Sequence, residues 1–138
     1  MKKFTIIDHT ADLGIEAYGK TLNELFENSA YGMFSQITDI KKIKNSEVTQ
    51  VKLKEHDTET LLITWLNELQ YHYSVKKMLF KEFRVNMTLP GGTNLSAIAS
   101  GEKINNHRIF HDIKAATYHD LRITRTPGGY KTRIIFDV

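Results

Sequence analysis

Both prolines of this 138-residue chain open the same short run, Pro-Gly-Gly, at residues 90–92 and 127–129. Proline fixes φ near the value that a turn needs, and glycine reaches the positive φ values that other residues avoid. Apolar and polar residues alternate around the first run, and strand-like segments lead into and out of the second. The sequence therefore predicts two β-hairpins, one over residues 80–100 and one over residues 121–138.

Two longer segments repeat apolar residues at helical spacing, over residues 22–37 and 61–73. The first helix is expected to begin at Thr21. Glu24 follows three residues later and predicts a capping box, in which each side chain accepts the other residue's backbone N–H. The second helix is expected to begin near Asp57, which is a good N-cap residue. Both apolar stripes are expected to pack into the core.

Three shorter segments have strand-like patterns outside the hairpins, at residues 4–9, 15–18 and 51–53. Residues 112–119 are compatible with either a short helix or the first half of a longer strand. Hairpin strands combined with two helices indicate an α+β protein with mainly antiparallel sheets. The length suits a single compact domain, residues 1–138.

The composition excludes several classes of site and of protein. The chain has no cysteine, which excludes thiol catalysis, iron–sulfur clusters and cysteine-ligated zinc. No apolar stretch approaches the roughly 18 residues of a membrane span, and no signal-type apolar core follows the N-terminal lysines. We therefore expect a cytoplasmic protein that has no contact with a membrane.

The charge is unevenly distributed along the chain. The net charge is only +3, but residues 103–138 carry a balance of +4 and residues 1–102 a balance of −1. A basic skew of this kind suits an acidic protein partner or a nucleic acid, and it also suits an ordinary solvated strand surface.

The acidic residues near the two ends of the chain are the most suggestive of chemistry. Asp8 and Asp12 bracket His9 between two expected strands, and Asp137 precedes the terminal carboxylate of Val138. If the final strand lies beside the first segment, several carboxylates converge, and their repulsion favours a bound hard cation such as Ca²⁺ or Mg²⁺. The alternative is that Asp12 caps a turn and Asp137 pairs with a neighbouring arginine.

Other catalytic and metal-binding patterns are weak. His107 and His111 are four residues apart, a spacing that would place both on one face of a helix, as in some zinc sites. The residues between them do not clearly indicate a helix, and no HExxH motif accompanies them. The chain also lacks a GxSxG elbow, a P-loop and a GxGxxG fingerprint.

The segment His9-Thr10-Ala11-Asp12-Leu13-Gly14-Ile15 resembles the HTADxG-type signature of the archease family. The likeness continues in order along the chain, through residues 24–28, 33–34, 59–62, 65–69, 101–102, 113–119 and 134–138. Each piece is weak alone, but together they span essentially the whole sequence at family-like spacing.

The resemblance implies a protein cofactor and not an enzyme. Archeases act on the RtcB-type RNA-splicing ligase, promote its guanylylation by GTP and permit repeated turnover in tRNA splicing. The resemblance also implies a divalent metal ion, Ca²⁺ first and Mg²⁺ or another ion as alternatives, with Asp12, Asp137 and the terminal carboxylate of Val138 as ligands. Apart from these acids, Lys114 is the residue that the family most associates with activation. His9 belongs to the same opening motif as Asp12.

Two other functions are kept open. The first is a chaperone or specificity modulator of an RNA-modifying enzyme such as a tRNA methyltransferase, which the same resemblance implies. The second is a small metal-dependent nuclease or phosphatase, although the chain lacks a second acidic motif and a clear general base. Within the matched segments, we expect Trp65 in the core, Asn67 and Glu68 on the solvated side of their helix, and Tyr118 packed.

Overall fold

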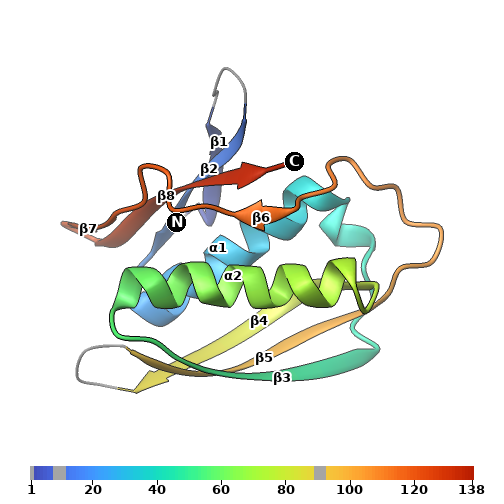
Figure 1. Ribbon diagram of the computed structural model, residues 1–138, viewed down its shortest axis with the longest axis horizontal. Coiled ribbons are helices and arrows are strands. Elements are labelled where there is room, and N and C mark those ends of the chain that lie inside the picture. The colour runs from blue at the N-terminus through green and yellow to red at the C-terminus, as the bar shows by residue number, and fades with distance from the viewer. Residues whose placement is uncertain (1, 8–11, 89–92) are drawn as a thin grey trace.

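The computed structural model describes residues 2–7, 12–88 and 93–138. Its elements form three layers, with two α-helices lying between two β-sheets (Figure 1). The helical elements are α1 (Leu22–Ile37), the short 3-10 helix η1 (Ile40–Lys42) and α2 (Thr58–Ser74).

The first sheet has the strand order β1-β2-β8-β6, and β7 also pairs with β8. Its strands are β1 (Phe4–Ile7), β2 (Leu13–Gly19), β6 (Ala115–Ala116), β7 (Ile123–Thr126) and β8 (Gly129–Asp137). The second sheet has the order β3-β5-β4. Its strands are β3 (Glu47–Lys54), β4 (Met78–Thr88) and β5 (Asn94–Lys103). Each of these pairings is antiparallel, which confirms the predicted α+β class.

Both predicted hairpins are present, as β4–β5 and β7–β8. The first Pro-Gly-Gly run falls on residues 90–92, which lie outside the described residues. In the second turn Gly129 has φ +151°, and a Cβ there would collide with the carbonyl oxygen of Gly19. Only glycine fits at this position. Residues 112–119 form neither a helix nor half of a long strand, because within them only β6 pairs with β8.

The helix starts are close to the predicted ones. The Thr21 hydroxyl accepts the backbone N–H of Glu24 at 3.1 Å, but the Glu24 carboxylate accepts the N–H of Lys20 and not that of Thr21. The first bond of the predicted capping box is therefore present, and the second is made to Lys20, the residue before the N-cap. Asp57 caps α2 as expected, because its carboxylate accepts the N–H of Thr60 at 2.7 Å.

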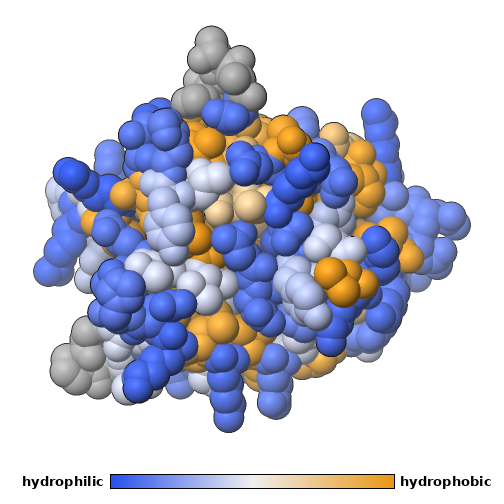
Figure 2. Space-filling view, in the orientation of Figure 1, coloured by the Kyte–Doolittle hydropathy of each residue, from blue (hydrophilic) through white to orange (hydrophobic). Residues whose placement is uncertain are grey.

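The core lies between the two sheets and includes the apolar sides of both helices. Trp65 is fully buried, as expected, and its indole N–H donates to the carbonyl oxygen of Phe26 at 3.0 Å. The viewed face is largely hydrophilic, with its apolar residues in separate small patches (Figure 2). In the described part of the chain, neither helix is long and apolar enough to cross a membrane.

Side chains from the helices occupy backbone groups at one edge of each sheet. The outer edge of β4 offers the N–H groups of Val85 and Met87, and α1 accepts both, through Glu27 at 2.8 Å and Asn23 at 3.0 Å. At β7, a carboxylate from the first turn of α2 accepts the N–H of Ile123 at 2.7 Å. A backbone N–H group that already has an acceptor cannot pair with a strand of another molecule. The helices therefore cover the sheets and also block further strand pairing at these positions of β4 and β7.

Candidate functional site

The pairing of β2 with β8 brings the two ends of the described chain together. Leu13 lies opposite Phe136 in this antiparallel pair. Asp12 directly precedes β2, and Asp137 is the last residue of β8. The carboxylates expected from sequence to converge therefore belong to neighbouring strand ends.

Lys114 lies on the other side of the same strand end. Ala115 is opposite Asp137 in the pairing of β6 with β8. The backbone N–H of Lys114 donates to the carbonyl oxygen of Asp137 at 2.8 Å. Figure 1 shows the C-terminus lying between the start of β2 and β6. We call the group Asp12, Lys114, Asp137 and Val138 the carboxylate edge.

The segment that carries Lys114 is held from α2. The side-chain amide of Asn67 donates to the carbonyl oxygen of Ala116 at 3.1 Å and accepts its N–H at 2.8 Å. One turn later, Gln70 donates to the carbonyl oxygen of Ile113 at 3.1 Å. The expectation that Asn67 is merely solvated is therefore wrong. Two amides at i and i+3 beside the apolar stripe were the sequence signal for this contact.

β8 holds the same segment from its other side. The backbone N–H and the hydroxyl of Thr117 both donate to the carbonyl oxygen of Ile135, at 3.0 and 2.9 Å. Ile113 is fully buried, whereas Lys114 is exposed. Tyr118 has 58% of its surface exposed, so the expectation that its ring packs is wrong. The segment is anchored at its backbone and presents Lys114 and Tyr118 to solvent.

The carboxylate edge is open to solvent and carries an excess of acid groups. Asp12 and Asp137 are both exposed. Among the described residues, no lysine or arginine nitrogen lies within 4 Å of the Asp137 carboxylate, so the expected alternative of an arginine pair is not found.

The donor chemistry of the edge fits a hard divalent cation, which prefers oxygen ligands. No group of three or more His, Cys, Asp or Glu side chains gathers in residues 2–7, 12–88 and 93–138. The edge instead offers two side-chain carboxylates, from Asp12 and Asp137, beside the main-chain carboxylate position of Val138. Asp8 and His9, which the sequence also singled out, lie outside the described residues.

The histidine pair does not form the zinc site that its spacing allowed. Residues 107 and 111 lie in a non-helical segment between β5 and β6. The ring of His107 is engaged on both nitrogens: Nδ1 accepts the N–H of Asn105 at 2.9 Å, and Nε2 lies 3.1 Å from the Glu102 carboxylate. His107 thus fastens the start of the segment to the end of β5, while His111 is exposed.

A family model described as the archease protein family (MTH1598/TM1083) matches residues 4–138. This chain belongs to the archease family. It is 41% identical to an archease of Methanosarcina barkeri over 99% of this chain and 97% of that protein. It is 39% identical to an archease of Sulfurisphaera tokodaii, with both chains fully covered.

Two solved structures are similar to this archease. The solution structure of protein 1598 of Methanobacterium thermoautotrophicum superposes with a TM-score of 0.88 at 36% identity, with both chains fully covered. A crystal structure from Thermotoga maritima, described as an archease and possible chaperone, has a TM-score of 0.65 at 24% identity and covers 96% of this chain and 94% of its own. At that identity the second likeness speaks for the fold alone.

Proposed function

We propose that this archease is a protein cofactor of an RtcB-type RNA-splicing ligase. It promotes guanylylation of the ligase and its repeated turnover in joining tRNA exon halves, and it catalyses no reaction itself. Family membership supports the choice of partner. The observation that carries the proposal is the carboxylate edge. It is supported by the bond from the backbone N–H of Lys114 to Asp137 and by the pairing of Leu13, next to Asp12, with Phe136, next to Asp137.

The edge acts by binding one conformation of the ligase more tightly than the other. A partner can shift a conformational equilibrium only by the difference between its affinities for the two states. Because the backbone of the edge is fixed by β8 and by Asn67, little ordering entropy is lost on docking. Lys114 supplies a cationic contact to a ligase carboxylate or to nucleotide phosphate, both of which favour charged donors.

The same proposal includes a divalent metal ion, Ca²⁺ or an ion of similar chemistry, at the edge. Asp12, Asp137 and the carboxylate of Val138 would hold it. When bound, such an ion neutralises the acid groups and offers positive charge to a partner. Calorimetric titration with CaCl₂ and MgCl₂ tests this directly. We expect one binding site that Asp137→Asn weakens at least tenfold, and equal binding by the variant would contradict the ligand assignment.

Multiple-turnover RNA ligation at limiting ligase tests the function. Addition of this archease should raise the number of ligations per ligase molecule, because each cycle needs a new guanylylation. Asp12→Ala should abolish that stimulation with no loss of thermal stability, since Asp12 is exposed. Glu47→Ala, an exposed acid at the start of β3 in the other sheet, is the matched control and should stimulate fully. Full stimulation by Asp12→Ala would refute the site.

A chaperone role is the second candidate, favoured by the description of the Thermotoga maritima relative as a possible chaperone. The proposed client class is an RNA-modifying enzyme such as a tRNA methyltransferase. A light-scattering assay with such a client separates the two functions. Suppression of client aggregation that is equally strong with Asp12→Ala, together with no effect on ligation, would favour the chaperone. Ligation stimulation that depends on Asp12 favours the ligase cofactor.

A further inference from the structure

A cavity lies away from the carboxylate edge, between η1 and the segment that follows β5. Its volume is about 530 Å³, within the range of roughly 300–1,000 Å³ that is typical of small-molecule sites. One wall comes from residues 38–44, which follow α1 and include η1, and the other from residues 105–110. The functions proposed above do not use this cavity.

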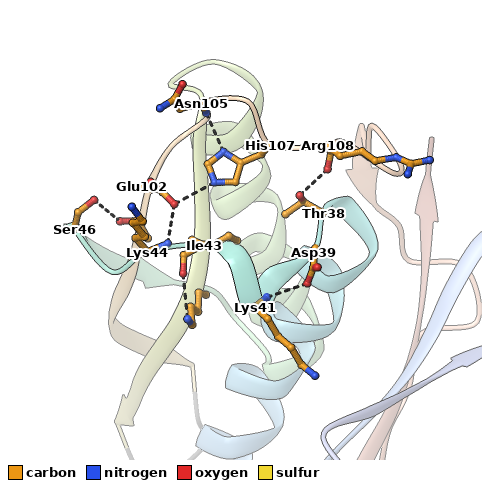
Figure 3. Close-up of polar contacts among 12 residues, drawn as sticks. Thr38, Asp39, Lys41, Ile43, Lys44, Ser46, Glu102, Asn105, His107 and Arg108 are labelled. Atoms are coloured by element: carbon orange, nitrogen blue, oxygen red, sulfur yellow. Dashed lines mark hydrogen bonds and ion pairs between the residues drawn. The ribbon is translucent and has the colours of Figure 1, made fainter.

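The second wall is fixed in place by main-chain and side-chain bonds (Figure 3). The Thr38 hydroxyl donates to the carbonyl oxygen of Arg108 at 2.6 Å. The N–H of Phe110 donates to the carbonyl oxygen of Ile37 at 2.7 Å. The side chain of His107 is only 8% exposed, and its contact with the Glu102 carboxylate holds this wall against the end of β5. The cavity therefore has a preformed shape and does not depend on a loose loop.

The acidic groups of the cavity are used by its own walls. Glu102 accepts the backbone N–H of Lys44 at 2.7 Å and faces the ring of His107. The backbone N–H of Lys44 is the main cause that lowers the pKa of Glu102, so this carboxyl is ionised at neutral pH. Asp39 caps η1 by accepting the N–H of Lys41 at 3.3 Å.

The cationic groups of the cavity are not used in this way. Lys42, Lys44 and Arg108 line it. In the described part of the chain, none of these three side chains has a carboxylate oxygen within 4 Å. The charge of Lys44 also helps to lower the pKa of Glu102, and the side chain of Arg108 extends away from Lys44 (Figure 3). The two lysines therefore form the cationic part of the cavity, and ammonium groups form strong charge-assisted hydrogen bonds with phosphate.

An aromatic ring stands beside these cations. Phe110 lines the cavity and has 46% of its surface exposed. The guanidinium of Arg108 lies over its ring, 5.7 Å from the centroid. Phenylalanine and arginine planes are the surfaces on which nucleic acid bases stack. A ligand that combines a phosphate with a flat aromatic group would use both features of the cavity at once.

We propose that this cavity binds a nucleoside 5′-phosphate, either as a free nucleotide or as the end of a strand. Lys42 and Lys44 hold the phosphate, and the base stacks against Phe110 and Arg108. The proposal is independent of the carboxylate edge, because it involves none of the residues of that edge.

NMR titration of the full chain with adenosine 5′-monophosphate, inorganic phosphate and adenosine tests the site. We expect the nucleotide to shift the amide signals of residues 105–108 saturably and to bind at least tenfold more tightly than phosphate or adenosine. Phe110→Leu should weaken the nucleotide about tenfold, since base stacking is lost, and leave phosphate binding unchanged. Lys44→Gln should weaken both. Both variants keep the main-chain bonds to Ile37 and Thr38, so both should fold.

Two variants outside the cavity serve as matched controls. Tyr71→Leu removes an aromatic ring with 45% exposure on α2, and Lys52→Gln removes an exposed cation on β3. Both should bind like the parent chain. Unsaturable shifts, shifts centred outside residues 105–108, or parent-like nucleotide binding by Phe110→Leu would overturn the proposal.

A 5′-phosphorylated tetraribonucleotide distinguishes the two sources of the ligand. Tighter binding of this strand than of the mononucleotide supports a strand end, and equal or weaker binding supports a free nucleotide. A strand without the 5′-phosphate should bind at least tenfold more weakly. If it binds equally well, the assignment of the phosphate to Lys42 and Lys44 is wrong.

Discussion

Asn67 shows how one side chain can replace a neighbouring strand. Its amide donates to the carbonyl oxygen of Ala116 and accepts the N–H of the same residue. Ala116 is almost fully buried, so these backbone groups have no access to water when the amide is removed. An unpaired buried backbone group costs about 1–3 kcal/mol. The contact therefore stabilises the fold and places the carboxylate edge as well.

Replacing Asn67 with alanine should lower the free energy of unfolding by about 2–4 kcal/mol, because both backbone groups of Ala116 lose their partner. Chemical denaturation measures this loss. Glu68→Ala on the same helix removes only a half-exposed contact with His72 and should cost less than about 1 kcal/mol. Similar losses for the two variants would show that the amide has no special role.

Glu27 is a half-buried carboxylate that should weaken the fold at neutral pH. Burial raises its pKa above the usual 4.5, even though its carboxylate accepts the N–H of Val85. An acid with a raised folded-state pKa contributes stability below pH 4.5 and loses it as the pH rises through the raised value. Glu27→Gln keeps an acceptor for Val85 and carries no charge.

We therefore expect Glu27→Gln to melt at a slightly higher temperature than the parent at pH 7, with the difference shrinking toward zero below pH 4.5. Thermal unfolding followed by circular dichroism across this pH range checks the sign. Glu27→Leu should be destabilising at both pH values, because it leaves the N–H of Val85 without an acceptor. A gain for Glu27→Gln that grows toward acid pH would contradict the argument.

At the scale of elements, the pairing of β4 with β5 shifts its register between Phe80 and Glu82, and Gly101 lies opposite Phe80. A Cβ on Gly101 would overlap the carbonyl oxygen of Leu79, which is backbone and cannot rotate away. The irregularity thus depends on the absence of a side chain at one position. The register shift also orients the end of β5, where the Glu102 carboxylate contacts the ring of His107.

Gly101→Ala should destabilise the protein by about 3 kcal/mol or more, near the upper end of the usual cost of overpacking. Gly128→Ala is the control, because a Cβ there meets nothing within 4 Å and the residue does not have positive φ. That variant should change the free energy of unfolding by less than about 1 kcal/mol. Equal destabilisation by the two substitutions would disprove the steric explanation.

The elements differ in how well the sequence predicts them. The hairpins and the helix starts are local features, carried by alternation, turn residues and caps within a few positions, and they were predicted nearly to the residue. Residues 112–119 were not, because β6 is only two residues long and depends on partners 18 to 49 positions away, in β8 and α2. No pattern within residues 112–119 encodes these contacts, although the two amides on α2 are a signal for them.

At the scale of the whole molecule, the adjacency of the strand ends next to Asp12 and Asp137 could be stated from sequence only as a condition. The acid groups were recognisable, but the adjacency of β2 and β8 is a property of the topology. The cavity beside η1 was invisible for the same reason, since its two walls come from segments more than 60 residues apart. The role of the edge residues stays a prediction from family resemblance, while no sequence motif indicates that Lys42, Lys44 and Arg108 line one cavity.

The closed edge of the second sheet affects how its backbone hydrogens exchange with heavy water. Amides on an outer strand usually exchange early, through small local openings. The amides of Val85 and Met87 are instead held by α1, so their deuterium uptake should be as slow as that of amides in the middle of that helix. Mass spectrometry of peptides covering β4 would measure it. Uptake within seconds would mean that the helix lifts off the strand while the rest of the domain stays intact.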